Sequence, residues 1–147
     1  MFDEAVKKLK QPGAVGVLPT DTVYGLVARA NDVQAVDRLY GLKRREGKPG
    51  TIIAATFDQL TGLGLKARYL KADEQFWPGA VSVIVPCGPE LAYLHEGTYG
   101  LAVRIPADEK LAKLLDQTGP LLTSSANHAG EPTANTVADA QSILEKR

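Results

Sequence analysis

Short apolar runs alternate with amphipathic segments along most of the chain, and this alternation limits the folds it can adopt. Runs of Val, Ile and Leu are typical of buried strands, and apolar residues three or four apart are typical of helices. Strands are expected at residues 14–18, 23–28, 51–55, 81–85, 101–105 and 121–123, and helices around residues 2–9, 33–42, 57–76, 108–118 and 136–144. This order predicts a layered α/β or α+β domain, in which helices flank a mixed sheet.

Size and composition indicate an ordinary globular protein. The 147 residues, 44% hydrophobic and 23% charged, fit one domain, which we expect to span residues 1–147. Cys87 is the only cysteine, so an internal disulfide is impossible and a reducing compartment is expected.

The first ten residues lack the apolar core of a secretion signal, and no apolar run approaches the ~20 residues that span a bilayer. A cytoplasmic location without membrane contact is therefore expected.

Polar residues follow the first expected strand. Pro19 removes an N–H donor and ends regular pairing, and Thr20, Asp21 and Thr22 come next. Small hydroxyl groups at a strand end suit a site that binds a small polar ligand. The alternative is a hydrogen-bonded turn.

A basic segment follows the second expected helix, in the sequence Lys43-Arg44-Arg45-Glu46-Gly47-Lys48-Pro49. Its four cations and one carboxylate give a net charge of +3, which leaves −3 for the rest of a neutral chain. Concentrated cations of this kind suit a small anion such as phosphate better than a long polyanion. The alternative is that they cap the negative end of the helix dipole.

Two further features could bind a ligand. Residues 123–132 combine hydroxyl and amide side chains with small residues that let a ligand approach the backbone, although they could also form a simple turn. Arg104 interrupts an apolar strand, where a charge needs a partner or a ligand unless it faces solvent at the strand end.

Several common sites are absent from the sequence. It contains neither the Gly-x-x-x-x-Gly-Lys-Ser/Thr loop nor the Gly-x-Gly-x-x-Gly motif of two standard nucleotide-binding folds. The serines at 124 and 125 lie outside a Gly-x-Ser-x-Gly elbow, which argues against a hydrolase. His95, His128 and Cys87 do not have the spacing of zinc ligands, so no metal site formed by the protein is expected.

Five motifs in order resemble the YrdC-like family, whose enzymes are threonylcarbamoyl-AMP synthases, and the resemblance covers essentially the whole chain. The motifs are Pro19-Thr20-Asp21-Thr22-Val23-Tyr24-Gly25-Leu26, Lys43-Arg44-Arg45, Trp77-Pro78-Gly79, Ala102-Val103-Arg104-Ile105-Pro106 and Ser125-Ala126-Asn127-His128-Ala129-Gly130-Glu131-Pro132. The resemblance implies a YrdC-like fold with a twisted mixed sheet. It also implies a nucleotidyltransferase that combines L-threonine, bicarbonate and ATP into threonylcarbamoyl-AMP and pyrophosphate, for modification of tRNA.

The resemblance also implies roles for single residues. Thr22, Arg104 and Ser125 fall on positions that bind threonine or its carbamate, with Arg104 at the amino-acid carboxylate. Lys43 and Arg45 match the catalytic Lys-x-Arg pair. The ATP-binding positions are Lys43, Arg45, Lys48 and Asn127, with Asn135 or Thr136 at a further nucleotide contact. Mg²⁺ is expected to enter with ATP, bound mainly through its phosphates, and tRNA or tRNA-modification proteins are expected partners.

The sequence departs from the family pattern at several places. Val27 replaces a usual glycine and Glu46 a usual proline, and Ala80 and Ser82 vary the motif after Trp77. Family members generally continue for several dozen residues, so we expect this domain to lack the usual C-terminal strands. Two alternatives stay open: a non-catalytic RNA- or nucleotide-binding module of the same fold, and a related activity that uses carbamoyl phosphate.

Overall fold

A six-stranded mixed sheet forms the centre of the computed structural model, which describes residues 3–19, 24–43 and 49–125. The strands are β1 (Val15–Pro19), β2 (Tyr24–Arg29), β3 (Thr51–Ile53), β4 (Val83–Pro86), β5 (Gly100–Arg104) and β6 (Leu121–Ser125). Their order across the sheet is β1-β2-β6-β3-β5-β4. The pair β3–β5 is parallel and the other neighbours are antiparallel, which confirms the expected mixed sheet.

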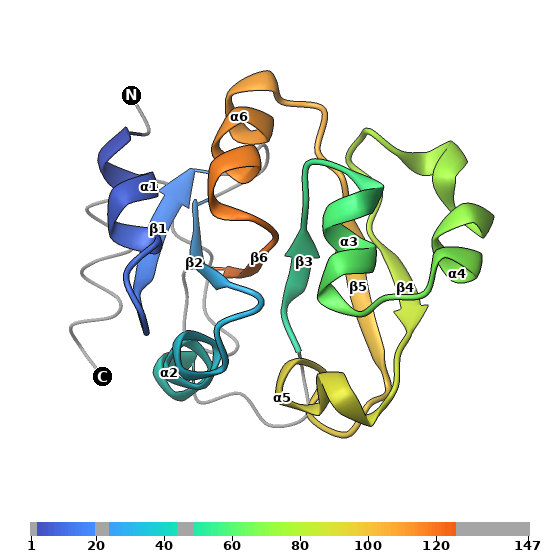
Figure 1. Ribbon diagram of the computed structural model, residues 1–147, viewed down its shortest axis with the longest axis horizontal. Coiled ribbons are helices and arrows are strands. Elements are labelled where there is room, and N and C mark those ends of the chain that lie inside the picture. Colours follow the sequence, from blue (N-terminus) through green and yellow to red (C-terminus); the bar gives the residue numbers. More distant parts are fainter. Residues whose placement is uncertain (1–2, 20–23, 44–48, 126–147) are drawn as a thin grey trace.

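Helices cover both faces of the sheet. Helices α2 (Val33–Lys43), α3 (Phe57–Leu63), α4 (Ala67–Ala72) and α5 (Ala92–His95) contribute to a core with Ile52, Val103 and Leu122. Helices α1 (Asp3–Leu9) and α6 (Glu109–Thr118) pack on the opposite face, over Ile53 and Leu121. Figure 1 shows α1 and α6 beside each other on their side of the sheet. The three-layer arrangement follows from the strands being apolar on both sides.

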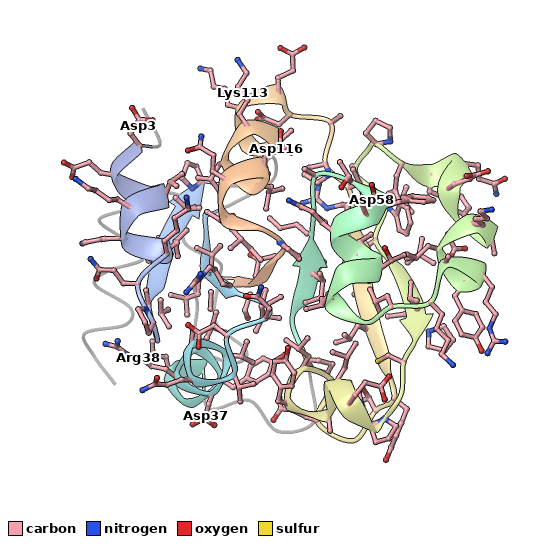
Figure 2. All side chains as sticks on the ribbon, in the orientation of Figure 1. Asp3, Asp37, Arg38, Asp58, Lys113 and Asp116 are labelled. Atoms are coloured by element: carbon pink, nitrogen blue, oxygen red, sulfur yellow. The ribbon has the colours of Figure 1, made fainter. Side chains whose placement is uncertain are left out.

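Charged residues lie on the outer sides of these helices, as their amphipathic spacing predicts. Figure 2 shows Asp37 and Arg38 at the surface of α2, and Lys113 and Asp116 projecting outward from α6. The inner positions Leu111, Leu114 and Leu115 are at most 2% exposed. The first residue of α2 departs from this spacing, since the side chain of Val33 is 55% exposed while Val36 and Leu39 are fully buried.

The helix expected at residues 57–76 is divided. It forms α3, α4 and the 3-10 turn η1 (Glu74–Phe76). Gly64 ends α3 with a φ of +128°, a conformation that favours glycine, and Leu65 then enters the core. Glycines at positions 62 and 64 weaken a helix, but the local sequence does not predict that the helix is divided there.

Other predicted boundaries shift by one or two residues. Strand β4 begins at Val83 and not at Val81, which is 46% exposed. Strand β6 continues through Ser125, two residues beyond the expected end. No element was predicted for residues 86–99, where the structure has η2 (Pro89–Leu91) and α5. The helix expected at residues 136–144 lies outside the described residues.

Candidate functional site

Small and hydroxylated residues form a row across the three strands β6, β3 and β5. Thr51 pairs with Thr123 on one side and with Ala102 on the other, so the three positions lie side by side on one face of the sheet. All three are half-buried, whereas their neighbours Ile52 and Leu122 on the opposite face have no exposed surface. This face is therefore partly open at the level of the row.

The open row lies on the same side of the sheet as α1 and α6. Ile53, two residues after Thr51, and Leu121, two residues before Thr123, are buried beneath those helices. Among the described residues, neither threonine hydroxyl of the row has a hydrogen-bond partner. Two such hydroxyls side by side can donate to and accept from a polar ligand.

Arg104 lies on this face, at the end of β5. Its pairing with Ile53 places it one level above the row, and only 6% of its surface is exposed. The guanidinium Nη1 donates to the carbonyl oxygen of Gly79 at 3.4 Å. The N–H of Gly79 in turn donates to the carbonyl oxygen of Ile105 at 2.9 Å, so the Trp77-Pro78-Gly79 turn is fixed against the end of β5. The alternative of a strand-end arginine in solvent is wrong.

The far end of the basic segment lies close to the row. The segment begins at Lys43, the last residue of α2, and its last residue, Pro49, is followed by Gly50, immediately before β3. The N–H of Gly50 donates to the hydroxyl of Tyr40 at 3.2 Å, and that hydroxyl donates to the carbonyl oxygen of Leu94 at 2.7 Å. A Cβ at position 50 would overlap the carbonyl oxygen of Thr123, so glycine is required there.

The three polar segments of the sequence, at residues 20–22, 43–49 and 123–132, all adjoin one end of the sheet. The first segment lies between Pro19 and Tyr24, which pair at the end of the β1–β2 ladder. Ser125 pairs with Gly25, the residue after Tyr24. Because Gly50 lies against Thr123, two residues before Ser125, the basic segment ends next to the strand that carries the serine.

The predicted site residues can be placed to different extents. The backbone of Ser125 lies at the end of the sheet just described, Lys43 is the last residue of α2, and Arg104 lies on the open face. Four residues of β6 separate the level of Arg104 from that of Ser125, which is about 13 Å along the strand. The remaining predicted site residues lie outside the described part of the chain: Thr22, Arg45, Lys48, Asn127, Asn135 and Thr136.

Sequence reasoning missed two contributions to this region. Thr51 was assigned to a buried strand, although its hydroxyl group on an otherwise apolar strand is a signal for an open face. Tyr40 was assigned only to the apolar side of α2. A buried tyrosine hydroxyl usually has a hydrogen-bond partner, so its polar end was the available signal.

The described residues contain no group of three or more His, Cys, Asp or Glu side chains that could hold a metal ion. No helix within the described ranges is long and apolar enough to cross a membrane.

Comparison with known proteins identifies the family. Residues 8–147 match the family model Sua5_yciO_yrdC, described as "Telomere recombination". The chain belongs to the Sua5/YciO/YrdC family. It is similar to proteins named threonylcarbamoyl-AMP synthase. It is 38% identical to one from Chromohalobacter salexigens over 96% of this chain and 78% of that protein. It is 35% identical to one from Bacillus subtilis, over 85% of this chain and 38% of that protein.

Solved structures of the family share the fold. A crystal structure of P. abyssi Sua5 complexed with L-threonine superposes with a TM-score of 0.80 at 30% identity, over 95% of this chain and 42% of that one. E. coli YciO superposes with a TM-score of 0.76 at 23% identity, over 97% of this chain and 72% of that one. This chain spans about two fifths of the length of the B. subtilis and P. abyssi proteins, and between 72% and 78% of the other two.

Proposed function

We propose that this chain forms threonylcarbamoyl-AMP and pyrophosphate from L-threonine, bicarbonate and ATP. The observation that carries the proposal is the similarity to P. abyssi Sua5, whose crystal structure contains L-threonine, along nearly the whole chain. The synthase names of relatives at 35–38% identity support the same activity.

The proposed reaction needs no nucleophile from the protein. The amine of threonine and bicarbonate form a carbamate with loss of water. A carbamate oxygen then attacks the α-phosphorus of ATP, and the bond to the departing pyrophosphate breaks. Holding two anions together and neutralising charge on the transferring group accounts for most of such catalysis. Because a carbamate readily loses CO₂ in water, an enclosed site also protects it.

Arg104 is the proposed partner of the threonine carboxylate. A guanidinium presents paired N–H donors that match a carboxylate, and this one lies on the open face of the sheet. Thr22 and Ser125 complete the proposed pocket for threonine and its carbamate. The cross-strand hydroxyls of Thr51 and Thr123 lie between Arg104 and the end of β6, where a bound substrate would meet them.

The nucleotide is proposed to bind at the end of the sheet where Ser125 and the ends of the basic segment lie. Lys43 and Arg45 would neutralise charge on the transferring phosphate, and Lys48, Asn127 and Asn135 would hold the rest of ATP. The separation of about 13 Å between the levels of Arg104 and Ser125 leaves room for the amino acid and the phosphates in line. Mg²⁺ is proposed to enter with ATP, ligated mainly by phosphate oxygens, because Mg²⁺ is commonly held by substrate phosphates and retained water.

Transfer of the product to tRNA and contact with tRNA-modification proteins are proposed as the next step. The alternative from a different class is a non-catalytic module that binds nucleotide or RNA. Such a module would bind tRNA with an affinity that falls steeply with salt, and would release no pyrophosphate.

A substrate-omission assay tests the proposal. Pyrophosphate release is measured with all three substrates and with threonine, bicarbonate or ATP left out in turn. We expect release only in the complete mixture. Equal release without threonine would show that the substrate is wrong, and no release in any mixture would favour the non-catalytic module.

A further inference from the structure

Tyr40 connects three parts of the chain that are far apart in sequence. Its hydroxyl donates to the carbonyl oxygen of Leu94 in α5 at 2.7 Å and accepts the N–H of Gly50 at 3.2 Å. Both hydrogen bonds are buried, and the residue is 8% exposed. Each replaces contacts with water that the groups lose on burial, so neither can be removed without leaving an unsatisfied backbone group.

The Gly50 bond ties the residue that follows the basic segment to α2, the helix in which the segment begins. Tyr40 lies three residues before Lys43, one turn earlier in α2. Gly50 also packs closely against β6, because a Cβ at this position would overlap the carbonyl oxygen of Thr123. The same hydroxyl thus sets the distance between the end of α2 and the point where β3 enters the sheet.

We propose that Tyr40 is a positioning residue for nucleotide binding. By fixing Gly50, it brings the start of β3 and the end of α2 to the end of β6, where the proposed ATP site lies. Tyr40 itself does not contact substrate in this proposal. The inference rests on the proposed function, which assigns the basic segment to ATP.

Tyr93 provides a matched control. Its hydroxyl also donates to a backbone carbonyl, that of Ala30, at 2.7 Å, and it lies on α5 beside α2. It makes no contact with Gly50 among the interactions of the described residues. Tyr40→Phe and Tyr93→Phe therefore remove the same atom and leave a carbonyl without its donor, but only Tyr40→Phe frees the N–H of Gly50.

The test compares wild type, Tyr40→Phe and Tyr93→Phe by ATP titration and by steady-state pyrophosphate release. We expect Tyr40→Phe to raise the Kd and KM for ATP about tenfold, the equivalent of a net loss of ~1.4 kcal/mol, while the KM for threonine changes little. Tyr93→Phe should leave both KM values near wild type. Thermal unfolding of both variants identifies any effect that comes from lost stability alone.

Amide hydrogen exchange at Gly50 provides a readout that needs no ligand. Exchange should be faster in Tyr40→Phe than in Tyr93→Phe. Equal ATP affinity in the two variants, or equal exchange at Gly50, would overturn the positioning role. A wild type that binds ATP without releasing pyrophosphate would reject the proposed synthase activity, and the Kd values would still decide the role of Tyr40. A wild type that does not bind ATP would overturn both.

Discussion

Arg104 and Gly79 are joined by a hydrogen bond of 3.4 Å from the guanidinium Nη1 to the backbone carbonyl, across 25 residues of sequence. The bond holds a buried cation at the end of β5, on the open face of the sheet. A charge that is removed from water in this way needs compensating partners. In the proposed reaction, the threonine carboxylate is one of them.

Replacement of Arg104 should therefore impair the use of threonine more than the use of ATP. Hydrogen bonds to charged groups contribute about 1.5–3 kcal/mol, so Arg104→Ala should lower kcat/KM for threonine by roughly 10- to 150-fold. Steady-state kinetics with each substrate varied measures the effect. Arg38→Ala, which removes an exposed arginine from α2 (Figure 2), is the control and should have normal kinetics. An unchanged KM and kcat for threonine in Arg104→Ala would remove this residue from the site.

The threonine row should matter for turnover and not for folding. Valine has nearly the same shape as threonine, and it is favoured in strands. Thr51→Val and Thr123→Val should each lower kcat/KM by about 5- to 10-fold, the effect of losing one hydrogen bond of ~1 kcal/mol. Their unfolding midpoints in urea should equal or exceed that of the wild type. Full activity in the double variant would show that the substrates do not reach this row.

Gly50 tests the close contact between the start of β3 and β6. An alanine Cβ would overlap the carbonyl oxygen of Thr123 and lie 3.0 Å from Leu122 Cδ1. Gly50→Ala should lower the free energy of unfolding by about 1–3 kcal/mol, the usual cost of overpacking. Gly41→Ala in α2 meets nothing within 4 Å and should stabilise the protein by up to about 1 kcal/mol. Urea unfolding of both variants measures these changes, and an unaltered stability in Gly50→Ala would contradict the packing described here.

Asp32 should make stability depend on acid pH. Its carboxylate accepts the N–H of Gly13 at 2.8 Å and that of Ala35 at 3.1 Å, and lies 3.6 Å from the Arg29 guanidinium. These contacts, the Gly13 bond above all, lower the pKa of the carboxyl below its usual 3.8. The folded pKa lies below the unfolded one, so the stabilisation is complete above about pH 4 and is lost as pH falls through the folded pKa.

Asp32→Ala should therefore cost about 1 kcal/mol at pH 7, the usual contribution of a helix N-cap. The difference from wild type should shrink below about pH 4, where the wild-type carboxylate becomes protonated. Asp37→Ala, at an exposed position of α2, should show little effect at either pH. A difference between Asp32→Ala and wild type that stays constant from pH 7 to pH 3 would contradict the cause given for the lowered pKa.

Local sequence patterns predicted the elements of the fold better than their boundaries. Alternating apolar runs identified all six strands, because a strand covered on both faces must be apolar along its length. The carboxylates of Asp32 and Asp108 accept the first N–H groups of α2 and α6, so each of these helices begins at a side chain that suits a helix start. The division at Gly64 depended on a tertiary effect, the burial of Leu65, which no local pattern reports.

The candidate site was predictable where a residue conflicts with its surroundings. Arg104 is a charge within an apolar strand, where a partner or a ligand was expected. The structure shows that its side chain is buried, on the face of the sheet that carries the threonine row. Tyr40 and Thr51 were not predicted as part of the region because their roles come from strand order. Strand β6 lies between β2 and β3, far from both in sequence, and this order brings Thr123 to Thr51 and Gly50. The motifs around Thr22, Arg45, Lys48, Asn127 and Asn135 remain predictions from the resemblance.

Identification of the reaction product tests the central claim most directly. The protein is incubated with ATP, L-threonine and ¹³C-labelled bicarbonate, and the mixture is analysed by mass spectrometry. We expect a threonylcarbamoyl-adenylate that carries the ¹³C label and forms in step with pyrophosphate. An adenylate without the label, or AMP and pyrophosphate without any threonylcarbamoyl product, would contradict the proposed synthesis.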